Sequence, residues 1–105
     1  MITFDFKEPS GILHCNLTGR MGADVCLKLG PEIQNHIAAR KSEAKDPIKV
    51  VFNLQEVDFI ASGFIRICIE TIKSINRENF SIVNTNPLIK RTFKIAGLDE
   101  TLNVS

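Results

Sequence analysis

Apolar and polar residues alternate along the first eighteen positions in the manner of β-strands. Ile2, Phe4 and Phe6 alternate with polar residues, which predicts a half-buried strand. Residues 8–11, Glu-Pro-Ser-Gly, are typical of a turn. A second alternating run follows at residues 12–18, so the chain is expected to begin with a β-hairpin.

The pattern in residues 20–30 supports two interpretations. Its apolar residues alternate as in a strand, whereas Asp24 is a residue type that caps a short helix. Pro31 predicts the start of a new helix after a break, because proline is favoured in the first helical turn. That helix is expected to reach about Lys41, and a charged loop is expected at residues 42–47.

The strongest pattern lies in residues 50–75. An apolar run at residues 49–54 predicts a central strand covered on both faces, and a polar turn is expected at residues 53–58. From Ser62 the period becomes helical, with apolar residues at Ile65, Cys68, Ile69, Ile72 and Ile75. A buried strand is therefore predicted to lead into an amphipathic helix that begins at Ser62. A serine at this position can cap the helix.

The remaining residues predict a strand, a helix and a short edge strand. The strand is expected at residues 80–83. Asn86 is the expected N-cap of the last helix, Pro87 its first residue, and Gly97 its left-handed stop, after which a leucine can fold back. Residues 102–104 form the expected edge strand. The order predicts one α/β domain over residues 1–105, with a mixed sheet of four to five strands, a parallel centre and three helices.

Composition narrows the classes of function. Thirteen basic and twelve acidic residues give a formal charge of +1, which argues against direct nucleic-acid binding. No apolar run approaches the roughly 20 residues that cross a bilayer, and the first ten residues do not resemble a signal peptide. A cytoplasmic protein is expected. The sequence contains no Gly-rich phosphate loop and no G-x-S-x-G elbow, so no enzyme is predicted.

The cysteines and histidines predict no metal site or cofactor. Cys15, Cys26 and Cys68 are far apart and form no C-x-x-C pair. Cys15 and Cys68 fall in apolar patterns and are interpreted as core residues, whereas Cys26 has no assigned role. His14 and His36 have no spacing that suggests metal ligands.

Three segments resemble the STAS domains, small bacterial anti-sigma-factor antagonists and their relatives. Residues 50–67, VVFNLQEVDFIASGFIRI, resemble the family's strand–turn–helix, and residues 84–104, NTNPLIKRTFKIAGLDETLNV, resemble its last helix and closing strand. LHCNLTGR at residues 13–20 matches an early strand that ends in Leu-Thr-Gly. The segments occur in the family's order over nearly the whole chain.

The resemblance implies a partner and a switch. Ser62 aligns with the serine that, in phosphorylatable members, is modified by a kinase that is also the anti-sigma factor. The unmodified antagonist binds that kinase, and the phosphorylated form releases it. This implies signal transduction in bacterial transcription, with a partner surface at Ala61, Ser62, Gly63, Phe64 and Arg66. The alternative interpretation of Ser62 is a helix cap with no further role.

Three residues depart from the family pattern. Ala61 replaces the usual aspartate, which changes the electrostatics of any phosphotransfer to Ser62. Gly63 stands where the family has serine or alanine, and Phe64 where it has glycine. Phe64 is either a core residue, the favoured interpretation, or an exposed anchor beside the serine.

Two further functions compete with the switch. The first keeps the fold as a scaffold or ligand-sensing module that works by forming a homodimer or by holding a small molecule. The second is an enzyme, for which only isolated serine, cysteine and histidine residues speak. A dimer indifferent to Ser62 substitution favours the scaffold, and turnover lost in Ser62→Ala or Cys26→Ala favours the enzyme.

Overall fold

The computed structural model describes residues 1–8, 10–44 and 46–105. Its sheet has the order β1-β2-β3-β4. The strands are β1 (Ile2–Lys7), β2 (Ile12–Met21), β3 (Lys49–Ile60) and β4 (Phe80–Val83). β1 is antiparallel to β2, and the β2–β3 and β3–β4 pairs are parallel. The predicted hairpin and the mixed sheet with a parallel centre are therefore confirmed.

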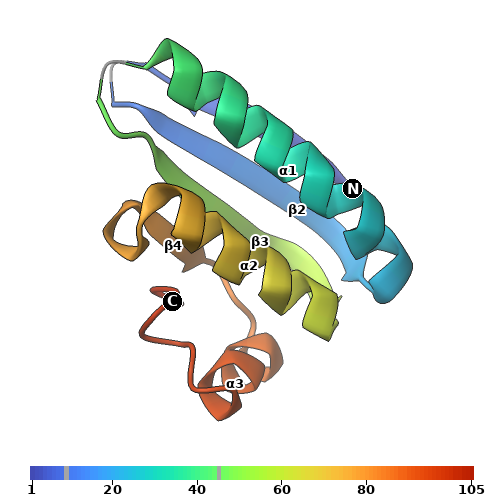
Figure 1. Ribbon diagram of the computed structural model, residues 1–105. Helices are drawn as coiled ribbons and strands as arrows, with labels where there is room; N and C mark the ends of the chain where they lie inside the picture. The colour runs from blue at the N-terminus through green and yellow to red at the C-terminus, as the bar shows by residue number, and fades with distance from the viewer. Residues whose placement is uncertain (9, 45) are drawn as a thin grey trace.

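Helices follow the second, third and fourth strands. They are α1 (Ala23–Glu43), α2 (Ser62–Ile75) and α3 (Pro87–Ile95), with a short 3₁₀ turn at Arg77–Asn79. α1 and α2 lie side by side over one face of the sheet, and α3 lies on the far side of α2 from α1 (Figure 1). Strand alternation supplies the apolar face beneath α1 and α2, because one register row across the sheet consists of Phe4, Cys15, Phe52 and Ile82.

The break predicted before Pro31 is wrong. α1 runs without interruption from Ala23 to Glu43, so Pro31 lies inside it and most of residues 20–30 are helical. An interior proline typically costs about 3 kcal/mol, since it removes one helix hydrogen bond. Burial of one face of the helix against the sheet offsets that cost. The buried residues recur at helical spacing: Cys26, Leu29, Ile33 and Ile37.

The polar turn predicted at residues 53–58 is also wrong. β3 continues through this segment to Ile60, paired with the second half of β2 across two register shifts. Asn53 finds partners within the sheet, because its Nδ2 donates to Asn16 Oδ1 (3.1 Å) and its Oδ1 accepts from the backbone N–H of Gln55 (3.1 Å). Polar side chains with such partners are compatible with a strand whose one face is polar.

Three loop predictions have mixed outcomes. The turn at residues 8–11 falls partly on Pro9, outside the described residues, while Gly11 adopts a φ of 72° and donates to the Lys7 carbonyl (2.8 Å). The loop predicted at residues 42–47 begins later, because α1 includes residues 42 and 43, and Lys45 lies outside the described residues. The edge strand predicted at residues 102–104 is reduced to one parallel bridge between Val104 and Ile82.

α3 has the caps that were predicted. The Asn86 Oδ1 accepts from the Ile89 N–H (2.9 Å), which satisfies one free donor of the first turn. At the other end Gly97 has a φ of 74°, and the Leu98 N–H donates to the Phe93 carbonyl (2.9 Å). This is the Schellman arrangement, which closes the C-terminal end of the helix, so both ends of α3 are capped.

Candidate functional site

The candidate site is built where β3 passes into α2. β3 ends at Ile60, Ala61 occupies the N-cap position, and Ser62 is the first residue of α2. The Ala61 N–H donates to the Met21 carbonyl (2.9 Å), which ties the start of α2 to the end of β2. The prediction that Ser62 caps α2 is wrong, because the N-cap is Ala61 and no side chain caps this end.

Ser62 is exposed to solvent at the positive end of α2. Alanine at the N-cap supplies no side-chain acceptor, so first-turn N–H groups are left without a capping partner. The Phe64 N–H is an exception, since it donates to the Ala61 carbonyl (3.0 Å). The hydroxyl of Ser62 thus stands beside free N–H donors and the positive end of the helix dipole, an environment that favours negative charge.

Phe64 is a core residue, and its inclusion in the partner surface is therefore wrong. Its side chain is 0% exposed, and its ring lies 6.0 Å from that of Phe52 on β3, measured between centroids. The buried face of α2 is turned from the expected one, because Phe64, Ile67 and Thr71 are buried in place of Ile65, Ile69 and Ile72, which are half-buried. Of the predicted surface, Ser62 and Arg66 are exposed, and Ala61 and Gly63 are half-buried.

A groove of about 650 Å³ separates the N-terminal halves of α1 and α2 beside Ser62. Two glycines allow the helices to approach beneath it. A Cβ added at Gly63 would lie 3.2 Å from the Cβ of Cys26, and one at Gly30 would lie 3.5 Å from Ile67. The groove is lined by Ala23, Cys26, Leu27, Gly30, Pro31, Gln34, Ser62, Gly63, Arg66, Ile67 and Glu70.

Cys26 has a packing role in this groove. It is 7% exposed on α1, its Sγ donates to the Met21 carbonyl (3.7 Å), and it contacts Gly63. Burial raises the pKa of its thiol, which disfavours the reactive thiolate form. The sequence left Cys26 unassigned because its contacts come from β2 and α2, both distant along the chain.

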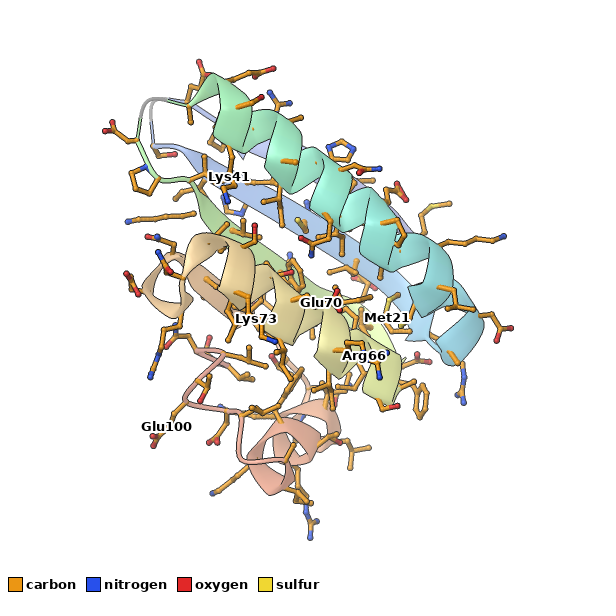
Figure 2. All side chains as sticks on the ribbon, in the orientation of Figure 1. Met21, Lys41, Arg66, Glu70, Lys73 and Glu100 are labelled. Atoms are coloured by element: carbon orange, nitrogen blue, oxygen red, sulfur yellow. The ribbon has the colours of Figure 1, made fainter. Side chains whose placement is uncertain are left out.

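The rim of the groove combines charged side chains and an exposed apolar one. Arg66 and Glu70 lie one turn apart on α2 (Figure 2), Arg66 being one turn beyond Ser62. Within the described residues, Arg66 forms no ion pair. Across the groove Leu27 is 80% exposed. Sequence reasoning missed Leu27, because the strand-like alternation of residues 20–30 predicted no helix face for it.

Near the groove, Arg20 at the end of β2 and Phe59 at the end of β3 form a cation–π contact. The Arg20 guanidinium lies 3.9 Å from the centroid of the Phe59 ring, and Phe59 is 38% exposed. Phe59 lies three residues before Ser62. Leu27 and Phe59 therefore add exposed apolar area that the sequence analysis did not assign to this end of the molecule.

Hydrogen bonds made by side chains of α1 join it to α2 along the groove. Thr71, fully buried, donates to the Ile67 carbonyl (2.8 Å) and accepts from Gln34 Nε2 (3.2 Å). Farther along, Lys41 Nζ donates to the Ser74 carbonyl (2.7 Å). These bonds hold the two helices in one relative position, so the groove has a defined shape.

Over residues 1–8, 10–44 and 46–105, no group of three or more His, Cys, Asp or Glu side chains is placed to hold a metal ion. In the same ranges, no helix has both the length and the apolar character needed to span a bilayer. His36, one of the histidines considered, stacks on the Phe4 ring with centroids 3.6 Å apart.

Comparison with known proteins gives the chain a family. Residues 5–105 match the model of the STAS domain. Similar solved structures include an anti-sigma factor antagonist from Mycobacterium paratuberculosis, at 23% identity and a TM-score of 0.77, with 99% of this chain and 85% of that chain covered. An anti-sigma-factor antagonist (STAS) domain protein from Planctomyces limnophilus has 18% identity, a TM-score of 0.77, and coverage of 99% and 87%.

A third structure shares the fold at lower identity. It is the anti-sigma factor antagonist SpoIIAA in its unphosphorylated form, with 10% identity, a TM-score of 0.67, and coverage of 90% of this chain and 83% of that chain. No curated protein sequence matches the chain. Because the family model covers nearly every residue, including the β3–α2 junction and α3, the chain belongs to the STAS domain family.

Proposed function

We propose that this protein is a non-enzymatic regulator that binds a serine-kinase-type anti-sigma factor through the Ser62 end of α2. The observation that carries the proposal is the exposed Ser62 hydroxyl at the first residue of α2, beside a groove with a defined shape. The partner would contact Ala61, Ser62, Gly63 and Arg66, with Leu27 as an apolar anchor on the opposite rim. Such a partner places the protein in the cytoplasm.

Phosphorylation of Ser62 would act on the interface and leave the fold intact. A phosphate adds about −1.5 to −2 charges at neutral pH. Because Ser62 is exposed at a helix N-terminus, free N–H groups and Arg66, which forms no ion pair with any carboxylate of the described residues, can accommodate that charge in the isolated protein. In the complex the same charge must be desolvated or placed near the partner's own groups, which favours release.

The absence of a carboxylate at position 61, which is occupied by Ala61, is consistent with Ser62 acting as a phosphate acceptor. Alanine at the N-cap leaves first-turn N–H groups available to a phosphate, where an aspartate would occupy one of them and repel the phosphate. The proposed consequence is that the modified form is held by the backbone of α2 and by Arg66.

The test combines phosphate mapping with binding. The purified chain is incubated with ATP and a candidate partner, a histidine-kinase-like ATPase of the anti-sigma-factor type, and the phosphate is located by mass spectrometry. We expect modification at Ser62 and at least tenfold weaker binding of that ATPase by Ser62→Asp. Ser42→Asp, at an exposed serine near the end of α1, is the matched control and should bind as the wild type does. An unmodified Ser62, together with full binding by Ser62→Asp, would refute the switch.

A second candidate function is a scaffold that forms a homodimer. It is favoured by the sheet order, which places β1 at an edge with its outer backbone groups open to another strand. Sedimentation equilibrium separates the two functions. A dimer that persists in Ser62→Asp and dissociates in Phe4→Pro, which removes a backbone donor from β1, would favour the scaffold.

A further inference from the structure

The outer face of α3 is an apolar and basic surface with no assigned role. Leu88 is 74% exposed and Ile95 is 77% exposed, and apart from Met1 and Leu27 no large apolar side chain of the described residues is as exposed. Seven residues separate the two, which brings them to the same side of the helix, about 10 Å apart along its axis.

Basic side chains occupy the neighbouring strip of the same helix. Lys90, Arg91 and Lys94 are all exposed, and residues 84–98 contain no acidic residue. None of the three basic residues forms an ion pair with a carboxylate of the described residues. Because the whole chain carries a formal charge of only +1, the +3 on α3 is a local concentration of charge.

The outer face also carries Thr92, whose hydroxyl is already bonded. Thr92 Oγ1 donates to the Leu88 carbonyl (3.1 Å), so its hydroxyl is used within the helix. The face therefore consists of two aliphatic anchors on one flank and a basic strip on the other.

α3 presents this face rigidly. Its inner side buries Ile89 and Phe93, and its ends are fixed by the Asn86 cap and the Schellman turn at Gly97. Asn86 Nδ2 also donates to the Val57 carbonyl (3.3 Å), which ties the helix start to β3. α3 lies on the side of the molecule away from α1 (Figure 1), and Glu100, in the turn that follows, projects outward (Figure 2). The outer face is thus free for a partner.

We propose that the outer face of α3 is a docking surface for an acidic amphipathic helix of a protein partner. Apolar side chains one heptad apart, flanked by charge of one sign, match the spacing with which two helices contact each other. The basic strip selects a partner helix whose apolar stripe is flanked by aspartate or glutamate. A helix bound at a membrane surface needs a broader apolar face, whereas here Arg91 occupies the centre of the outer face.

The probe is a pair of synthetic 18-residue helical peptides with the same leucine stripe, one flanked by glutamates and the other by lysines. Titration of the ¹⁵N-labelled full chain should shift amide resonances of residues 86–98 with the acidic peptide only. We expect at least tenfold weaker binding in Leu88→Ser and in Arg91→Glu, and weaker binding at higher salt. Leu27→Ser and Lys28→Glu, at exposed positions of α1, are the matched controls and should leave binding unchanged.

Several results would overturn the proposal. They are equal binding of the lysine peptide, absence of any shift at millimolar peptide, or equal loss of binding in Leu27→Ser. Binding of phosphatidylcholine–phosphatidylserine vesicles that is lost in Leu88→Ser would also overturn it, by assigning the face to a membrane. Ser62→Asp should bind the acidic peptide normally, so failure of the Ser62 switch and failure of this docking surface are distinguishable.

Discussion

The close approach of α1 and α2 can be tested by adding one methyl group at each of two glycines. Gly63 and Gly30 both lie in helices and are both half-buried. Replacing a helical glycine by alanine stabilises by up to about 1 kcal/mol, because alanine has less backbone freedom to lose. What separates the two sites is the space that the new Cβ would enter.

At Gly30 the facing helix leaves adequate space for the new Cβ, whereas at Gly63 it does not. The new Cβ would lie 3.5 Å from an Ile67 side-chain atom at Gly30, an ordinary contact, but 3.2 Å from the Cys26 Cβ at Gly63. The Cys26 Cβ is fixed to the α1 backbone, so relief requires a shift of one helix. Overpacking of this kind typically costs about 1–3 kcal/mol. We expect Gly30→Ala to change the stability little, because a clash between the new Cβ and the ring of Pro31 offsets the propensity gain of about 1 kcal/mol, and Gly63→Ala to destabilise by about 1 kcal/mol.

Urea unfolding followed by circular dichroism measures both changes. Cys26→Gly removes the opposing Cβ, so in that background Gly63→Ala should become stabilising, and the double-mutant cycle should show a coupling of about 1–2 kcal/mol. The reasoning is refuted if Gly63→Ala stabilises the wild type. It is also refuted if the cycle shows no coupling between positions 26 and 63.

Two further predictions concern the core beneath the site. Phe64→Ala should lower the free energy of unfolding by about 3–5 kcal/mol, and Phe64→Leu by about 1 kcal/mol. A Phe64→Ala variant as stable as the wild type would contradict the core assignment. Arg66→Ala, at an exposed position, should leave the urea midpoint nearly unchanged and weaken partner binding. Burial raises the pKa of the Cys15 thiol from 9.0 to about 12, so the native state holds this proton more tightly. The contribution of this thiol to the free energy of unfolding is therefore complete below pH 9 and is lost as the pH rises from 9 to 12. Over that range the urea midpoint of Cys15→Val should fall less steeply than that of the wild type.

The family pattern around Ser62 acquires a physical meaning in the structure. Gly63 replaces a serine or alanine, and here glycine is needed because Cys26 on α1 lies against it. Phe64 replaces a glycine, and its ring fills the space between α2 and β3 next to Phe52. Both departures are accommodated in the packing of α2, and the serine between Ala61 and Gly63 is exposed.

The sequence by itself determined the elements whose signals are local. The alternation of β1, the existence of α2, and the caps of α3 at Asn86 and Gly97 each depend on residues within a few positions of one another, and each was predicted correctly, although the buried face of α2 was not. The sequence also placed Ser62 correctly at the start of a helix, but the prediction that Ser62 caps that helix was wrong.

Tertiary structure decided the elements whose stability comes from distant partners. Pro31 marks a break by local rules, but α1 continues through it because the sheet and α2 bury one of its faces. The polar residues after Asn53 indicate a turn, but β2 supplies the hydrogen bonds that keep them in β3. The groove, its exposed Leu27 and the contact of Cys26 with Gly63 arise only when α1 and α2 meet. Local propensities amount to about 1 kcal/mol per residue, so burial of a whole helix face or strand edge outweighs them.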